Sequence, residues 1–106
     1  MKKTWLVGDS GGTGTDWCLA DASGERKYFS TESYQPVHFS EAFFDRMSAF
    51  WKTTGLDPAT EIHFYGAGCS MQHNQEQVKA HFNALGFSKV FVDSDLLGTC
   101  SGLLGN

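Results

Sequence analysis

The amino-acid sequence predicts an α/β domain built on one mixed, five-stranded sheet with three helices. Two observations support this prediction. Three short strand-like segments follow one another near the start of the chain, which is typical of an antiparallel meander. Later strand-like segments alternate with helical patterns, and such crossovers make that half of the sheet parallel. With 106 residues, the chain has the length of one domain, residues 1–106, with a modest core.

The predicted strands are separated by turn residues or by helical segments. We expect the meander at residues 4–8, 15–21 and 26–31, and single strands at 61–65 and 89–93. Within the second strand, Trp17 and Leu19 alternate with smaller or polar residues, which is the two-residue period of a sheet. Gly24 follows in a turn, where it can adopt positive φ.

The first helix is predicted from its ends and from its apolar stripe. Ser40 is a favourable N-cap, and Phe39 and Phe44 flank it with the spacing of a hydrophobic staple. Gly55 follows the last position of the stripe, as glycine does at many helix C-termini. The stripe comprises Phe39, Phe43, Met47, Phe50, Trp51 and Thr54. We therefore expect one helix between Ser40 and Gly55.

Two further helices are predicted, one after each of the last two strands. Asn74 and Gln77 have the spacing of a capping box, so the second helix is expected to begin near Asn74 and to end at Gly86. Phe87 is placed to fold back onto Phe82, as in a Schellman motif. The third helix is expected after the last strand, with an apolar stripe of Leu96, Leu97, Cys100, Leu103 and Leu104.

Composition excludes several classes of partner. The formal net charge of -4 and the pI near 5.4 indicate no basic surface for nucleic acid or an anionic membrane. No apolar run approaches the roughly 20 residues that span a bilayer. The first apolar run is also too short for a signal peptide, so we expect a cytoplasmic protein.

The three cysteines, Cys18, Cys69 and Cys100, are odd in number and widely separated. This spacing argues against a disulfide framework and against a zinc site built on a Cys-x-x-Cys pair. We therefore interpret each cysteine as a small buried hydrophobic residue.

Three loops follow the carboxyl ends of predicted strands, at residues 9–15, 66–71 and 93–99. Ligands of open α/β sheets collect at that edge, and all three loops carry small residues. Two of them also carry carboxylates. We therefore expect a binding site where the three loops meet.

The glycine-rich loop at residues 9–15 is the best candidate for binding phosphate. It is neither a Walker A loop nor a Rossmann fingerprint, because no Gly-Lys-Ser/Thr follows and the next element is a strand. Its glycines allow backbone N–H groups to approach an anion, as in a nest, and Thr13 and Thr15 add hydroxyls. Asp9 would repel phosphate but is suited to Mg²⁺, usually through water. The alternative is an ordinary hairpin turn with a solvated aspartate.

All three loops resemble the motifs of a known superfamily. Asp9-Ser-Gly-Gly-Thr-Gly-Thr-Asp16 resembles the first phosphate motif of the actin, Hsp70 and sugar-kinase superfamily. More narrowly, it is similar to the BadF/BadG/BcrA/BcrD ATPase group, which includes N-acetylglucosamine kinase-like proteins. Tyr65-Gly-Ala-Gly-Cys-Ser70 and Asp93-Ser-Asp-Leu-Leu-Gly-Thr99 agree in order and spacing, so the resemblance covers the whole chain.

This resemblance implies a ribonuclease-H-like fold and an ATP-dependent sugar kinase that uses Mg²⁺. Asp95 matches the general base that takes a proton from the sugar hydroxyl, although a residue at its position can also simply cap a helix. The loop at 33–38 falls where the kinases place an asparagine-containing sugar loop, but this chain has Gln35 and no asparagine there. The nucleotide- and metal-binding residues implied are Asp9 (also the metal ligand), Ser10, Gly11, Gly12, Thr13, Gly14 and Thr15. The substrate-binding residues implied are Gln35, Gly68, Cys69, Ser70 and Asp95.

The superfamily has two such domains with ATP between them, and the loops of the second domain are not in this sequence. We therefore expect an N-terminal half that, alone, binds ATP weakly and is inactive as a kinase, with its own C-terminal domain and a sugar or amino sugar as partners. A homodimer is left open. Two other functions also stay open: an ATPase that activates a dehydratase or reductase through an iron–sulfur cluster, and a non-catalytic sugar- or nucleotide-sensing domain.

Overall fold

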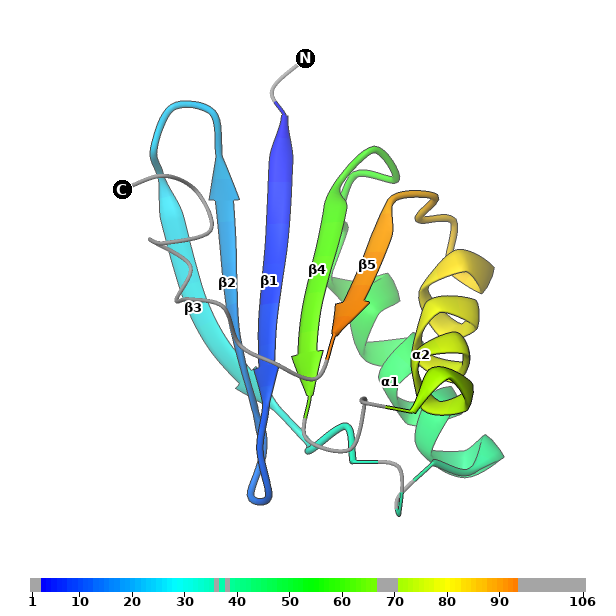
Figure 1. Cartoon of the computed structure of the whole chain (residues 1–106). Helices are drawn as coiled ribbons and strands as arrows, with labels where there is room; N and C mark the ends of the chain where they lie inside the picture. Colours follow the sequence, from blue (N-terminus) through cyan, green and yellow to red (C-terminus); the bar gives the residue numbers. More distant parts are fainter. Residues whose placement is uncertain (1–2, 36, 38, 67–70, 94–106) are drawn as a thin grey trace.

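The computed structural model describes residues 3–35, 37, 39–66 and 71–93. Within them the chain is an α/β protein with one five-stranded mixed sheet, as predicted (Figure 1). The elements are β1 (Thr4–Ser10), β2 (Thr15–Asp21), β3 (Arg26–Thr31), α1 (Glu41–Thr54), β4 (Glu61–Gly66), α2 (Gln72–Ala84) and β5 (Val90–Asp93). The third predicted helix lies outside the described residues.

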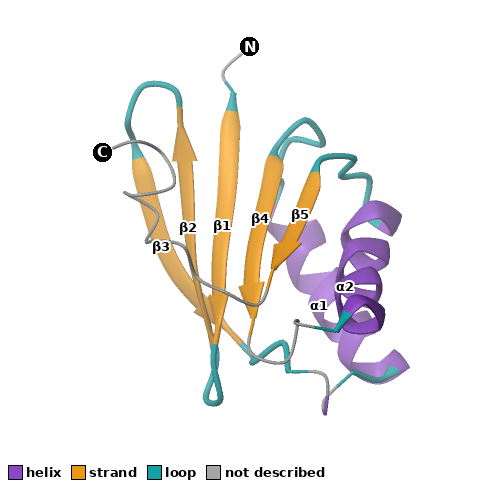
Figure 2. Ribbon diagram, viewed as in Figure 1, coloured by secondary structure: helices purple, strands orange, loops and turns teal. Residues whose placement is uncertain are grey.

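The strands lie in the order β3-β2-β1-β4-β5. The pairs β1–β2 and β2–β3 are antiparallel, whereas β1–β4 and β4–β5 are parallel. This confirms a meander followed by parallel strands. Both described helices lie on the same side of the sheet (Figure 2).

Local capping determines where α1 begins and ends. Ser40 Oγ accepts a hydrogen bond from the Phe43 backbone N–H at 3.1 Å, and the rings of Phe39 and Phe44 pack with centroids 5.1 Å apart. Gly55 ends the helix in the left-handed conformation, with φ of 67°. The predicted N-cap, staple and terminating glycine are all confirmed.

The predicted start of α2 is wrong, whereas its end is confirmed. The helix begins at Gln72, and its N-cap, Met71, makes no side-chain capping bond. The Met71 carbonyl accepts the N–H groups of Asn74 and of the next residue, at 3.1 and 3.2 Å, so the helix extends a turn earlier than the capping box suggested. At the other end, Phe87 N donates to Phe82 O at 3.2 Å, which is the longer bond of a Schellman motif.

The main core lies between the sheet and the two helices, and Trp17 is at its centre. The Trp17 side chain is 1% exposed, and its ring lies edge-on to Trp51 with centroids 4.8 Å apart. Its indole N–H donates to Thr31 Oγ1 at 2.8 Å, so the polar atom is satisfied. Gly8 lies directly beneath this ring, where a Cβ atom would overlap the indole. The Trp17 ring therefore needs a glycine at this point of β1.

A buried polar chain connects the two helices through Tyr34. The Trp51 indole N–H donates to Tyr34 Oη at 2.9 Å, and Tyr34 Oη lies 3.2 Å from His81 Nε2. Burial raises the pKa of the Tyr34 hydroxyl well above its usual value, so this group keeps its proton. Since an indole N–H only donates, the Tyr34 hydroxyl is left to donate to a neutral His81.

Acid should destabilise the protein through His81. Burial lowers the pKa of His81 from 6.5 to about 4, so the unfolded chain binds this proton more tightly than the folded protein. The stabilisation is complete above pH 6.5 and is lost as the pH falls towards 4. We expect His81 to account for a loss of roughly 3 kcal/mol over this window.

The measurement is urea unfolding of wild type and His81→Gln between neutral and acid pH. The advantage of wild type over His81→Gln should shrink as the pH falls. His73→Gln, at an exposed position on the same helix, is the control and should keep a constant difference from wild type. A difference for His81→Gln that does not change with pH would show that the imidazole is not buried neutral.

A smaller apolar cluster lies on the other side of the sheet and comprises Val7, Cys18, Ala20 and Tyr65. Cys18 is buried, as predicted, but it is also disulfide-bonded, which corrects its interpretation as a simple buried hydrophobic residue. Both other cysteines lie outside the described residues. Neither helix of the described ranges is long and apolar enough to cross a membrane.

Candidate functional site

One edge of the sheet brings together the turns predicted to bind ligands. The β1–β2 turn and the carboxyl ends of β4 and β5 lie at the same edge, together with the segment that leads from β3 to α1 (Figure 1). Of the predicted substrate-binding residues, Gln35 is described. Gly68, Cys69, Ser70 and the predicted base Asp95 lie outside the described residues. The candidate site is therefore built from the β1–β2 turn and the residues around it.

Three carboxylates lie in one row across this edge. Asp9 pairs with Asp16 on β2 and with Tyr65 on β4, and Tyr65 pairs with Asp93 on β5. Paired residues of neighbouring strands point to the same face, so all four side chains share the face opposite the helices. Neighbouring strands are about 4.8 Å apart, which places Asp9 next to Asp16 and roughly 10 Å from Asp93.

All three carboxylates of this row are exposed, whereas Tyr65 between them is buried. Burial, and to a smaller extent the Asp93 carboxylate, raises the pKa of the Tyr65 hydroxyl. Asp16 accepts a hydrogen bond from Ser30 Oγ at 3.0 Å, which orients its carboxylate. The row is therefore a solvent-accessible strip of negative charge beside the glycine turn.

The glycine turn is closed by one backbone hydrogen bond, from Gly11 N to Gly14 O at 2.9 Å. None of its three glycines has positive φ, so the alternating right- and left-handed nest suggested by the sequence is not formed. The backbone is nevertheless open: a Cβ atom at Gly11 would contact nothing, and one at Gly12 would meet only the Gln35 amide nitrogen at 3.5 Å. Thr13 at the tip is exposed.

The hydroxyls of Ser10 and Thr15 already have partners within the protein. Both residues are buried, and Thr15 Oγ1 lies 2.9 Å from Ser10 Oγ and from the backbone oxygen of Glu32. Ser10 Oγ also accepts the Tyr34 N–H at 2.7 Å, and Ser33 Oγ donates to the Gly11 carbonyl. These bonds fix the turn against the segment after β3. Ser10, at the start of the turn, is thus hydrogen-bonded to the backbone of Tyr34, the residue whose side chain connects the two helices.

Sequence reasoning did not include Asp16, Tyr65 and Asp93 among the site residues. The position of Asp16 could have been predicted from the nearby sequence, because Asp16 faces Asp9 across a short hairpin. The other two join the row only through the parallel pairing of β1 with β4 and of β4 with β5. That register is set by contacts between distant parts of the chain.

A polar groove of about 530 Å³ opens beside the turn. It is lined by Gly12, Thr13, Glu32, Ser33, Val37, Ser40 and Arg46. Arg46 forms a two-bond ion pair with Glu32, with Nε to Oε2 at 3.1 Å and Nη2 to Oε1 at 3.0 Å. This groove connects the glycine turn with the first turns of α1.

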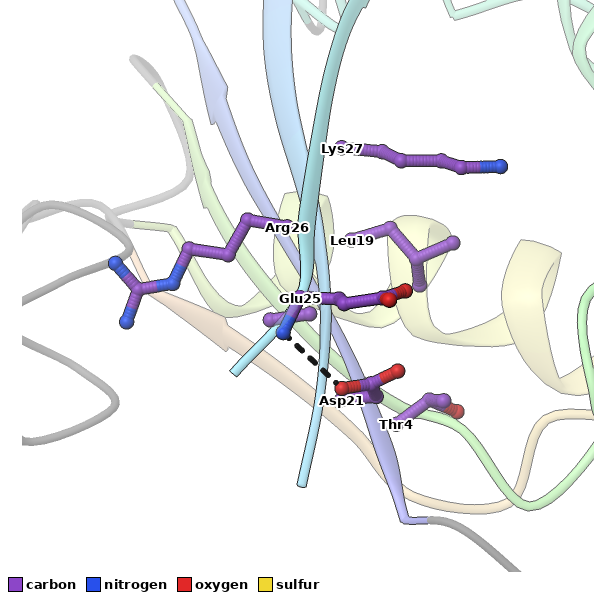
Figure 3. A pocket seen from close by; sticks show the side chains of 7 residues that line it. Thr4, Leu19, Asp21, Glu25, Arg26 and Lys27 are labelled. Carbon is purple, nitrogen blue, oxygen red and sulfur yellow. Dashed lines mark hydrogen bonds between the residues drawn. The ribbon is translucent and has the colours of Figure 1, made fainter. Parts of the chain in front are cut away.

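A second hollow, of about 400 Å³, lies at the opposite edge of the sheet, around the β2–β3 turn (Figure 3). There the Asp21 carboxylate accepts the N–H groups of Ser23 and Glu25 at 2.9 and 3.2 Å, which organises the turn. Arg26 and Lys27 extend to opposite sides of β3 (Figure 3). This hollow is remote from the carboxylate row, and its Asp21 carboxylate serves to stabilise the β2–β3 turn.

Among the described residues, no group of three or more His, Cys, Asp or Glu side chains is arranged to hold a metal ion. A cation at the row would therefore take most of its ligands from water or from a bound phosphate. Compared with known proteins, the sequence matches no family model and no curated protein.

Proposed function

We propose that this chain is the N-terminal half of an ATP-dependent sugar kinase with a ribonuclease-H-like fold. In this proposal the acceptor is a sugar, with an amino sugar of the N-acetylglucosamine kind as the first candidate. Three meandering strands followed by two parallel strands are the arrangement that the resemblance implies, and they support the fold. The remaining part of the site would come from a second domain.

The observation that carries the proposal is the carboxylate row beside the glycine turn. Asp9 is the penultimate residue of β1, next to the turn where the backbone is open to an anion, and Asp16 reinforces its charge. A carboxylate pair of this kind attracts a divalent cation, and the cation in turn allows a phosphate to approach. A solvated hairpin would not need its two aspartates directly opposite one another, because like charges in that position are destabilising.

The residues present suit Mg²⁺ held in the manner typical of nucleotide sites. Mg²⁺ keeps several waters and uses one or two carboxylates together with substrate phosphates, so Asp9 and Asp16 suffice on the protein side. When bound, the ion would offset the charge of the phosphates. Gly11, Gly12 and Thr13 would face the phosphates, whereas Ser10 and Thr15 would hold the turn in place through their buried hydrogen bonds.

The acceptor hydroxyl would be activated by Asp95, as the resemblance implies. A carboxylate there would orient the hydroxyl and accept its proton as the phosphoryl group is transferred. Gln35 lies near Gly12, so its side-chain amide could hydrogen-bond a sugar that is bound beside the turn. Cys18, which is buried and disulfide-bonded, has no free thiolate for an iron–sulfur cluster, and this counts against the activator alternative.

The proposal predicts sugar-dependent ATP consumption that requires Asp95. In an assay of the full-length protein, with its C-terminal domain, against a panel of amino sugars and hexoses, Asp95→Asn should lower the rate by about 10²- to 10⁴-fold, the usual contribution of a general base. The control is Asp57→Asn, an exposed aspartate before β4 at the opposite edge of the sheet. Equal rates for wild type and Asp95→Asn would exclude Asp95 as the base. Sugar binding without any ATP consumption would favour the sensing alternative.

A further inference from the structure

Three buried residues lie in the middle of the sheet face opposite α1 and α2, which we call the back face. Val7 on β1 and Cys18 and Ala20 on β2 are 5%, 4% and 2% exposed. Both described helices lie on the other side of the sheet, so neither of them accounts for this burial (Figure 2). Small side chains on an open sheet face remain in contact with water. Burial to this degree therefore requires a cover over the middle of the back face.

The cover does not extend to the two edges of the sheet. Val7 pairs with Cys18, and Cys18 pairs with Tyr28 on β3. In the other direction Val7 pairs with His63 on β4, and His63 pairs with Phe91 on β5. These five residues form one row across the back face, and Tyr28 and Phe91 at its ends are 69% and 52% exposed. The cover is therefore narrow and lies over β1 and β2.

Cys18 offers a covalent attachment at the centre of the covered area. It is disulfide-bonded, and the described part of the chain contains no other cysteine. Within this chain its partner is therefore Cys69 or Cys100. The Cα atoms of two disulfide-bonded residues are about 4.4–6.8 Å apart. The partner must therefore come close to β2 on the back face.

Cys69 has too little chain on either side to reach this position. It is the third residue after Gly66, which ends β4, and the third before Gln72, which begins α2. Gly66 pairs with Ser10, so it lies two strands and three residues from Cys18, a distance of about 14 Å. Three residues span at most about 11 Å. Both connections would have to be fully extended, and the second would have to pass to the other side of the sheet, where α2 lies.

Cys100 has enough chain to reach Cys18. It is the seventh residue after Asp93, which ends β5. Asp93 lies three strands and two residues from Cys18, a distance of about 16 Å, whereas seven extended residues span about 23 Å. A path from β5 to β2 also passes over β4 and β1, which includes the covered middle of the back face. Leu96 and Leu97 lie on this path and are apolar, as the cover must be.

We infer that Cys18 is bonded to Cys100, and that this bond holds the C-terminal segment, residues 94–106, against the back face. The occupant of this face is then the chain itself, and apolar side chains of the segment replace water over Val7, Cys18 and Ala20. The inference does not rest on the kinase proposal. Asp95 belongs to the tethered segment, so in a kinase the bond would also limit how far the proposed base can move.

The bond is tested by tryptic mapping of the chain without reductant, after free thiols have been alkylated. Cleavage at lysine and arginine places the three cysteines on separate peptides, residues 4–26, 53–79 and 90–106. Peptide 4–26 should be linked to peptide 90–106, and peptide 53–79 should carry an alkylated Cys69. Linkage to peptide 53–79, the absence of any linked peptide, or a disulfide-linked dimer on a non-reducing gel would overturn the inference.

Reduction should uncover the apolar cluster of the back face. Dithiothreitol breaks the S–S bond by thiol–disulfide exchange: its two thiols are oxidised to a cyclic disulfide, and the sulfurs of Cys18 and Cys100 take up the two electrons and two protons. The segment is then held by non-covalent contacts alone. The reduced protein should therefore bind more of the apolar dye anilinonaphthalene sulfonate, and its melting temperature should fall by at least about 10 °C.

Two serine variants of the full chain separate the bond from other effects of the reductant. Cys100→Ser should bind as much dye without dithiothreitol as reduced wild type does, and it should respond no further to the reductant. Cys69→Ser is the matched control and should behave as wild type does in both conditions. If the mapped bond is present but Cys100→Ser binds no more dye and melts at the wild-type temperature, the bond does not hold a cover on the back face and the inference is wrong.

Discussion

Replacing Trp17 with alanine should destabilise the protein more than any surface change, by about 3–5 kcal/mol. The side chain is 1% exposed and contacts five other aromatic rings, so its loss leaves a large cavity at the centre of the core. Those rings are Phe29, Tyr34, Trp51, Phe64 and Phe82. The free energy of unfolding of a domain is only about 5–15 kcal/mol, so the variant should be close to unfolded. Denaturant unfolding followed by circular dichroism measures the loss.

Tyr28→Ala is the matched control for Trp17→Ala. Tyr28 is also an aromatic residue of the meander, but it lies on β3 with 69% of its surface exposed. Its loss should change the free energy of unfolding by no more than about 0.5 kcal/mol. Similar losses for the two variants would mean that Trp17 does not occupy the centre of the core.

Local signals account for the parts of the fold that the sequence predicted well. The cap at Ser40, the Phe39–Phe44 staple and Gly55 all act within one helix, and they are found as expected. The end of α2 was also predicted from local signals, because the hydrogen bonds of the Schellman motif join residues only a few positions apart. The start of α2 was missed because Asn74 has the right residue type for a cap, yet the Met71 carbonyl closes an earlier turn.

The candidate site was less predictable because it depends on contacts between distant segments. Tyr65 joins Asp9 only through the β1–β4 register, and Asp93 through the β4–β5 register. The Arg46–Glu32 pair joins an α1 side chain to one that follows β3. Ser10 carries a hydroxyl that could bind phosphate, but its burial and its hydrogen bond to the Tyr34 N–H appear only in the folded protein. Residue types can be read from the sequence, whereas their partners require the fold.

The second large effect is expected for Asp9→Asn. The substitution keeps the size of the side chain and removes the negative charge at the end of β1, beside the open backbone of the turn. A neutral amide is a poorer ligand for Mg²⁺, so Mg²⁺-dependent affinity for ATP should fall at least about tenfold. Binding of ATP without Mg²⁺ should change little. The exposed position of Asp9 means that the fold should tolerate the change.

The most direct test of the proposed function is calorimetry of ATP binding with and without Mg²⁺. It compares wild type, Asp9→Asn and Glu76→Gln, the last being an exposed carboxylate on α2 that serves as the charge control. We predict that Mg²⁺ strengthens ATP binding to wild type and to Glu76→Gln, and that Asp9→Asn loses this gain. Absence of Mg²⁺-dependent binding, or an equal gain in Asp9→Asn, would contradict a metal–phosphate site at the carboxylate row.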